Sequence, residues 1–158
     1  MLILNDYTTS IVKAFDEIDE HWREYEGLVI AGTHSFHDTE MMIQKIKEAR
    51  EIGVPTLLIC AGHQLGAIEW ARAHGIHDAT SEEFGIGTFV VKKRPEGLKV
   101  GLHEGESWWS NYEVVINWNI PNNFISVPYH PEYQSSFEKP HPLLIKFLKN
   151  AKKYTMAM

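Results

Sequence analysis

One stretch decides the fold of this chain, and it reads Thr56-Leu57-Leu58-Ile59-Cys60-Ala61-Gly62-His63-Gln64-Leu65. The apolar run Pro55–Cys60 has the length and composition of a buried strand. A glycine follows at once, and the pattern then becomes helical over Gln64–Ala73 and ends near Gly75. The stretch therefore predicts a buried strand, a sharp turn and a helix, with Cys60 at the turn.

Alternating strand and helix patterns lie upstream of this stretch. Leu2–Leu4 and Gly27–Ala31 are short apolar runs that predict strands. Thr8–Ile18 has apolar residues at helical spacing, and a second helical pattern follows the candidate cap Asp38 and covers Met42–Ile52. The order strand, helix, strand, helix, strand, helix favours a parallel sheet with helices on its faces.

The second half of the chain has a different character. Short apolar segments with turn residues between them predict an antiparallel extension or hairpins, with strands at Thr88–Lys92, Leu98–Leu102, Tyr112–Asn117 and Phe124–Pro128. The last pattern, His141–Lys153, predicts a helix with an apolar stripe and a solvated face rich in lysine.

Composition excludes several classes of function. With 158 residues, 44% of them hydrophobic, the chain fits one domain spanning residues 1–158. The net charge of −6 argues against a nucleic-acid-binding surface, and no apolar run is long enough to span a bilayer. The start of the chain lacks the basic and long apolar regions of a signal peptide. A single cysteine cannot form an intramolecular disulfide, so a reducing, cytoplasmic setting is expected.

Cys60 is the first candidate for catalysis. At a strand–turn–helix junction the turn lifts a side chain out of the sheet, as in a nucleophile elbow. The helix N-terminus favours the reactive thiolate, Gly62 gives the turn freedom and room, and the Ala61 N–H would face the oxygen of an attacked amide. The alternative is a buried structural cysteine, the commoner role of a lone cysteine without such a context.

A cysteine nucleophile needs a base and a group that orients the base. The segment His130-Pro131-Glu132 follows a predicted strand, and strand ends are where α/β sheets place their chemistry. His130 and Glu132 share a side of an extended chain, so Glu132 can hold the imidazole in the needed tautomer. These two residues are the candidate base and orienting group.

Two other histidine pairs have spacings that can bind zinc: His34 with His37, and His74 with His77. No cysteine accompanies either pair, so surface or helix-capping roles are expected and no metal site is predicted. His34 lies in the loop after a predicted strand and could still contact a substrate.

Four stretches together resemble class I glutamine amidotransferases, and within that family the glutaminase domain of CTP synthase. Cys60–Gln64 matches the family's elbow, and Asp78–Phe84 matches its Asn-Ser-Thr-Glu-Phe segment. Tyr112–Val114 matches its Tyr-Glu-Val segment, and His130–Ser135 with Pro140–Leu143 matches its C-terminal motif. The resemblance implies a single-domain, three-layer, flavodoxin-like α/β fold, shortened at the N-terminus, with antiparallel strands in the C-terminal half.

The resemblance also implies a reaction. Cys60 would attack the side-chain amide of a small-molecule substrate, glutamine, and release ammonia, while His130, oriented by Glu132, transfers protons. Water would then hydrolyse the glutamyl thioester to glutamate. The oxyanion would lie between the N–H groups of Ala61 and Gly32. The family's reaction requires no metal or organic cofactor.

The substrate end of the site departs from the family pattern. Gln64 and Glu83 match positions that hold the α-carboxylate and α-amino end of glutamine. Asn111 stands where an arginine is expected to pair with the substrate carboxylate, and the loss of such a charge-assisted bond costs about 1.5–3 kcal/mol. The oxyanion loop Ile30–His34 keeps one glycine of the family's glycine-rich loop, and Leu58 stands where the elbow pattern has glycine.

These departures leave three functions open. The first is a stand-alone glutaminase that releases ammonia or donates it to a separate synthetase, since the synthetase half is absent here. The second is a hydrolase of a different amide or γ-glutamyl substrate, which Asn111 and the adjacent Trp108 and Trp109 favour. The third is a non-catalytic binding or regulatory relative, which the altered oxyanion loop favours. A shortened sheet could also expose an edge that another copy covers, which makes a homo-oligomer a further hypothesis.

Overall fold

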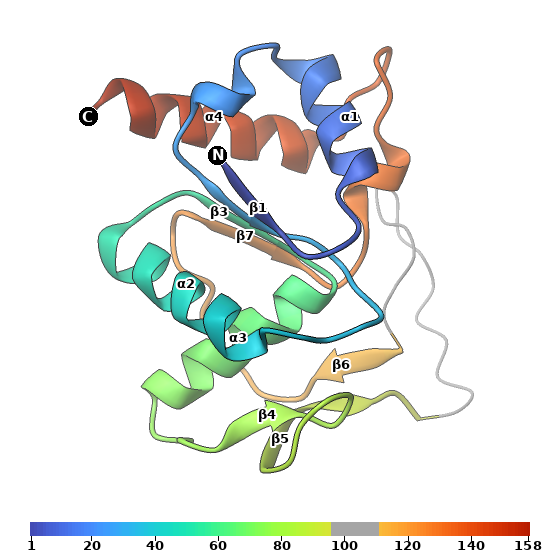
Figure 1. Cartoon of the computed structure of the whole chain (residues 1–158), viewed down its shortest axis with the longest axis vertical. Helices are drawn as coiled ribbons and strands as arrows, with labels where there is room; N and C mark the ends of the chain where they lie inside the picture. The colour runs from blue at the N-terminus through green and yellow to red at the C-terminus, as the bar shows by residue number, and fades with distance from the viewer. Residues whose placement is uncertain (96–110) are drawn as a thin grey trace.

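The computed structural model of the chain describes residues 1–95 and 111–158. Within these residues, parallel strands form a main sheet in the order β1-β2-β3-β7 (Figure 1). The strands are β1 (Leu2–Leu4), β2 (Leu28–Ile30), β3 (Thr56–Ile59) and β7 (Phe124–Val127). The three strands predicted in the first half of the chain are confirmed.

Two layers of helices enclose this sheet. The helices are α1 (Thr9–Ile18), α2 (Thr39–Ile52), α3 (Ala61–Ala73) and α4 (Pro142–Met156), with 3-10 turns η1 (Trp22–Glu24) and η2 (Pro131–Gln134). Figure 1 shows α1 and α4 on one face and α2 and α3 on the other, which gives the three layers of the predicted α/β fold. The predicted helices are confirmed, and α3 begins at Ala61 rather than at Gln64.

The central strands β2 and β3 are apolar except for Thr56, because both faces of the sheet are covered. Successive side chains of a strand point to opposite faces. Val29 and Leu57 therefore pack with α1 and α4, whereas Ile30 and Leu58 pack with α2 and α3, and all four side chains are fully buried. This double burial fixes the register of the strands and the position of the residues that follow them.

A second, smaller sheet packs against the outer side of α3 (Figure 1). Its strands are β4 (Ala79–Ser81), β5 (Thr88–Lys93) and β6 (Tyr112–Val114), in the order β4-β5-β6. The sheet is mixed, because β4 pairs with β5 in parallel and β5 pairs with β6 in antiparallel. The sequence predicted β5, extended β6 to Asn117, and missed β4. The predicted strand Leu98–Leu102 lies outside the described residues.

The last predicted strand has a different place from the one expected. Phe124–Pro128 was assigned to the antiparallel extension, but β7 runs parallel to β3, with Leu57 opposite Ile125. A short apolar segment carries no information about which strand it pairs with, so the chain's return to the main sheet is decided by packing. The parallel pairing of β7 with β3 matters for function because it brings the residues after β7 beside those after β3.

No helix in the part of the chain that the structure describes is long and apolar enough to cross a membrane.

Candidate active site

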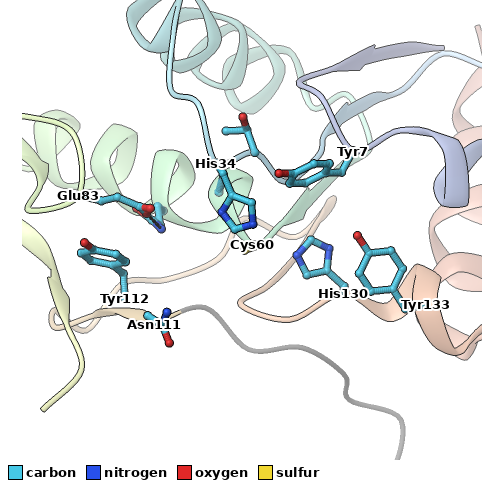
Figure 2. Close-up of a pocket in the computed structure, with 11 residues that line it drawn as sticks. Tyr7, His34, Cys60, Glu83, Asn111, Tyr112, His130 and Tyr133 are labelled. Atoms are coloured by element: carbon cyan, nitrogen blue, oxygen red, sulfur yellow. Dashed lines mark hydrogen bonds between the residues drawn. The ribbon is translucent and has the colours of Figure 1, made fainter. Parts of the chain in front are cut away.

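A cleft of about 290 Å³ opens at the carboxyl ends of the main-sheet strands (Figure 2). Each strand of that sheet is followed by a residue that lines the cleft: Tyr7 after β1, Thr33 after β2, Cys60 after β3 and His130 after β7. Ligands of open α/β sheets bind at this edge. The other lining residues are His34, Ala61, Gln64, Glu83, Asn111, Tyr112 and Tyr133.

Cys60 lies at the sharp turn between β3 and α3, as the sequence predicts. Its backbone has φ +52° and ψ −102°, a conformation that a non-glycine residue adopts at a cost. The Cys60 N–H donates to the carbonyl of Val127 at 2.9 Å, so the turn is fastened to β7. The side chain is half-buried and borders the cleft.

Gly62 gives the turn room but not conformational freedom. Cys60 itself has the positive φ, whereas Gly62, which the structure also describes, does not have one. A Cβ at Gly62 would collide with the carbonyl oxygen and Cβ of Ile30. Glycine is therefore required because the first turn of α3 approaches the backbone of β2.

His130 and Glu132 form a buried pair after β7. Nδ1 of His130 lies 3.1 Å from Oε2 of Glu132, and the two residues are 8% and 3% exposed. The imidazole is also hydrogen-bonded to Cys60. Because Nδ1 is engaged by Glu132, Nε2 is the ring nitrogen left for the thiol. The three residues predicted as a triad are therefore in consecutive contact.

The pKa of the imidazole is shifted by both of its partners. Burial by itself lowers the pKa of His130, but hydrogen bonds with Cys60 and Glu132 and the charges of both residues outweigh burial and raise it to about 9. The imidazolium form is thus favoured over a wide pH range when its partners are ionised.

Packing fixes the orientation of the imidazole. The ring of Tyr133 stacks on that of His130, with the ring centres 4.8 Å apart and the planes 13° apart. On another side, a Cβ at Gly32 would lie only 2.6 Å from Cε1 of His130. Gly32, predicted as an oxyanion donor, therefore also allows the loop after β2 to approach the imidazole.

Gln64 and Glu83, the residues predicted to bind the substrate, form a second hydrogen-bonded group with Ser81. Nε2 of Gln64 donates to Glu83 at 2.9 Å, and the hydroxyl of Ser81 donates to the Gln64 carbonyl oxygen at 2.9 Å. The Glu83 N–H donates in turn to the Ser81 hydroxyl at 3.1 Å. Gln64 is almost fully buried, so its position holds the Glu83 carboxylate at the wall of the cleft.

Asn111 and Tyr112 enter the cleft from the start of β6 (Figure 2). The Asn111 carbonyl accepts the N–H of Arg94 at 2.7 Å, which joins it to the end of β5. Among the described residues that line the cleft, none is a lysine or an arginine. The preceding tryptophans, 108 and 109, lie outside the described residues.

Sequence reasoning missed four residues of the cleft. Tyr133 and Tyr112 directly adjoin residues that it singled out, so their positions in the two motifs offered a signal. Thr33 lies in the loop already assigned to the oxyanion. Tyr7 offered no signal, because it follows the first strand and reaches Cys60 only through the pairing of β1, β2 and β3.

The histidines weighed as zinc ligands have other surroundings. His34 borders the cleft and meets the ring of Tyr7 edge-on, with centres 5.4 Å apart. His74 ends α3 and lies with Nδ1 2.7 Å from the carbonyl oxygen of Trp70, a capping arrangement. In residues 1–95 and 111–158, no group of three or more histidine, cysteine or acidic side chains is placed to hold a metal ion.

Fold and site together define a class of protein: a three-layer α/β domain with cysteine, histidine and glutamate in contact at the carboxyl end of a parallel sheet. The chain belongs to the family described as Glutamine amidotransferase class-I, which matches residues 2–120.

Similarity to known proteins points to one branch of that family. The CTP synthase of Methanoregula boonei is 47% identical over 75 residues, which are 47% of this chain and 14% of that protein. The CTP synthase of Methanoculleus marisnigri is 28% identical, with 82% of this chain and 34% of that protein covered. The curated relatives that match most of this chain are much longer proteins, and the chain spans about a third of their length.

The fold has a close counterpart among solved structures. The glutaminase domain of Trypanosoma brucei CTPS, solved with bound acivicin, matches with a TM-score of 0.73 and 17% sequence identity. The match covers 96% of this chain and 92% of that one. The likeness at this identity establishes the fold, and the chemistry has to be argued from the site.

Proposed function

We propose that this chain hydrolyses the side-chain amide of glutamine to glutamate and ammonia, with Cys60 as the nucleophile. The observation that carries the proposal is the chain of contacts from Cys60 through His130 to the buried Glu132 at the edge of a cleft. A buried structural cysteine has no need of a strained backbone, a histidine partner and a second carboxylate.

The reaction has two halves. The Cys60 thiolate attacks the amide carbon, a C–S bond forms, and the imidazolium of His130 protonates the departing nitrogen as the C–N bond breaks. Ammonia leaves, and a glutamyl thioester remains on Cys60. Water then gives a proton to His130, attacks the thioester carbon and displaces the thiolate of Cys60. Glutamate is released, and the Cys60 thiolate and the His130 imidazolium are restored.

Glu132 keeps the imidazole in the tautomer that this cycle needs. Its carboxylate holds Nδ1–H, so proton exchange with the substrate takes place at Nε2. The N–H groups of Ala61 and Gly32 are assigned to the oxyanion. Ala61 is the first residue of α3, where helix geometry leaves N–H groups without a partner inside the helix.

Glutamine recognition is assigned to the group built around Gln64. Glu83, held by Gln64 and its own N–H bond to Ser81, offers a carboxylate to the substrate ammonium group. The matched CTP synthases suggest that the ammonia goes to a synthetase. We propose such a synthetase as the partner that accepts the ammonia.

A direct assay tests this proposal. The purified protein is incubated with glutamine, and ammonia release is compared with that of Cys60→Ala. We expect release from the wild type and a loss of at least about 10⁴-fold in the variant, because removal of a covalent nucleophile leaves only binding and oxyanion effects. Release that persists in Cys60→Ala would assign the activity to another group.

A second candidate is hydrolysis of another amide or a γ-glutamyl compound. The cleft favours it in one respect, because its described lining offers the carboxylate of Glu83 but neither lysine nor arginine for a substrate carboxylate. The same assay with a panel of γ-glutamyl amides separates the two candidates. Cys60-dependent release from another amide, and not from glutamine, selects the second. No Cys60-dependent release from any amide leaves the non-catalytic relative as the remaining function.

A further inference from the structure

The loop after β2 is held by the residues that follow β1. The Nδ2 group of Asn5 donates to the carbonyl of Ala31 at 2.9 Å. The N–H of Tyr7 donates to the carbonyl of Gly32 at 3.2 Å. Two successive peptide units of the predicted oxyanion loop are thus fixed from one side by neighbouring residues of another strand end.

The side chains of the loop are fixed from the same segment. The hydroxyl of Thr33 donates to the carboxylate of Asp6 and accepts the N–H of Ser35 at 2.9 Å. The ring of Tyr7 packs on Gly32 and meets the ring of His34 edge-on. Figure 2 shows Tyr7 and His34 beside each other at the wall of the cleft.

These bonds set the direction of the loop's N–H groups. In a trans peptide the C=O and the N–H point to opposite sides. When Asn5 holds the Ala31 carbonyl, the N–H of Gly32 in the same peptide unit points away from Asn5. When Tyr7 holds the Gly32 carbonyl, the N–H of Thr33 points away from Tyr7. Both donors therefore have fixed directions before any substrate binds.

Asn5 combines a left-handed backbone with a buried side-chain oxygen that has no hydrogen-bond partner among the residues that the structure describes. Its backbone lies in the left-handed region, with φ +82°. Its Oδ1 is one of two buried side-chain polar atoms without a hydrogen-bond partner in the described parts of the chain, and the other is Oε1 of Glu132 in the candidate triad. Strain and unsatisfied polar groups concentrate at functional sites, where the surrounding structure compensates for their cost.

We propose that Asn5, Asp6 and Tyr7 form a clamp that positions the oxyanion loop Ala31–His34 for chemistry at Cys60. The clamp, rather than a glycine-rich loop, orients the backbone N–H groups that stabilise a developing negative charge. The three are positioning residues, and the proposal rests on Cys60 acting as the nucleophile of the function proposed above.

The test compares two reactions of Cys60 that differ in their need for an oxyanion site. In acylation by p-nitrophenyl acetate, the thiolate adds to the carbonyl carbon, an oxyanion forms, and p-nitrophenolate leaves with the electron pair of the broken C–O bond. In alkylation by iodoacetamide, the thiolate displaces iodide directly and no oxyanion forms. Neither reaction requires recognition of glutamine.

The key variant is Asn5→Asp, which keeps the shape of the side chain and places an acceptor against the Ala31 carbonyl. Its matched control is Asn123→Asp, because Nδ2 of Asn123 also donates to a backbone carbonyl, that of Gly53 at 2.6 Å, at the other end of the sheet. A second pair is Thr33→Val, which removes the hydroxyl, and Thr33→Ser, which keeps it. Thermal unfolding is measured for all four.

We expect Asn5→Asp and Thr33→Val to slow acylation at least tenfold relative to alkylation, while Asn123→Asp and Thr33→Ser keep the wild-type ratio. If the ratio of the acylation rate to the alkylation rate in Asn5→Asp equals that of the wild type, the clamp is overturned. If Asn5→Asp does not fold, an unchanged ratio in Thr33→Val overturns it. An equal loss of both rates also overturns it, because that result indicates damage to Cys60 itself.

The two proposals can fail separately. If the wild type releases ammonia from no amide and the ratio still falls in Asn5→Asp, the clamp stands and the proposed function falls. If the wild type hydrolyses glutamine and the ratio is unchanged, the proposed function stands and the clamp falls.

Discussion

The two sides of the cleft are built differently. On one side, Cys60 and His130 follow the adjacent parallel strands β3 and β7 of the main sheet, which pack against helices on both faces. On the other side, Glu83 lies in the turn between β4 and β5, and Asn111 directly precedes β6, so both are positioned by the small mixed sheet packed on α3. The proposed nucleophile and base are thus fixed by the core, whereas the residues proposed to bind the substrate lie on an appended layer.

This difference indicates that the main-sheet side of the cleft can keep its chemistry while the small-sheet side changes its selectivity. Main-sheet geometry leaves little freedom, because a shift of β3 or β7 would disrupt packing on both faces. The small sheet can change its loop residues with little cost to the core. The departure from the family pattern at Asn111 lies on this second side, so we expect it to affect which amide binds more than how it is cleaved.

After the loss of Cys60 itself, the largest effect on the first side is expected for Glu132→Gln. The substitution keeps the shape but removes the charge that helps to raise the pKa of His130 to about 9. We expect kcat for glutamine hydrolysis to fall about 10²–10⁴-fold, as for other orienting carboxylates. Since a lower pKa means that the imidazolium is lost at lower pH, the alkaline limb of kcat/KM should move from near pH 9 to lower pH.

A matched control for this substitution is Glu69→Gln. Glu69 is also a buried carboxylate, but it pairs with Arg50 at 2.6 Å between α2 and α3. We expect it to lower the free energy of unfolding and to leave the pH profile of the folded enzyme unchanged. A profile that stays in place in Glu132→Gln would show that this carboxylate does not set the charge of His130.

On the second side, Glu83→Gln should weaken binding rather than cleavage. Loss of the carboxylate removes the partner of the substrate ammonium, so KM for glutamine is expected to rise about tenfold or more, with kcat changed by less than about threefold. Glu82→Gln is the control, because Glu82 accepts the Lys93 N–H at the exposed edge of the same turn. A fall in kcat with constant KM would move Glu83 to the chemical step.

A smaller gain is expected for Asn111→Arg. If glutamine is the substrate, a guanidinium at this position can pair with its α-carboxylate, and KM should fall up to about tenfold at constant kcat. Asn111→Lys, which supplies charge without the planar fork, should give a smaller gain. Steady-state kinetics with glutamine and with an amide that lacks the carboxylate check the assignment. An equal change for both substrates would contradict it.

The last effect concerns stability below neutral pH rather than activity. His63 follows Gly62 on α3, and its Nδ1 lies 2.6 Å from the hydroxyl of Ser126. Burial lowers the pKa of His63 to about 4. Between its ordinary value near 6.5 and 4, the unfolded chain therefore binds a proton that the folded chain does not.

The free energy of unfolding should therefore decrease as pH falls through this range, by up to about 3 kcal/mol from this residue. His63→Gln should flatten that part of the curve measured by urea unfolding. His77→Gln, at an exposed position after α3, should keep the wild-type slope. A curve with the same slope in His63→Gln would assign the acid sensitivity to other groups.

The elbow was predictable because its signal is local. A buried strand, a cysteine, a glycine and a helix occur within one short stretch, and the structure places them as predicted. The contact between His130 and Glu132 was predictable for the same reason, since the two residues are separated only by Pro131. The pairing of His130 with Cys60 was inferred from the need of a cysteine nucleophile for a base and from the position of His130 after a predicted strand, because nothing in the His130 segment says which strand β7 joins.

The parts that could not be predicted depend on pairing between distant segments. The position of β7 in the main sheet and the existence of β4 were missed, because short apolar segments do not specify their partners. Gln64 was assigned to the substrate, yet its two polar groups bond to Glu83 and Ser81, a network visible only after folding.

The sequence alone determined that Cys60 lies at a strand–turn–helix junction, because apolar periodicity and glycine placement act over a few residues. Only the tertiary structure decided what surrounds it. The parallel order β1-β2-β3-β7 brings Tyr7, Thr33 and His130 to the same edge from distant parts of the chain. Burial of both faces of the sheet selects that order, and burial is a property of the whole fold rather than of any one segment.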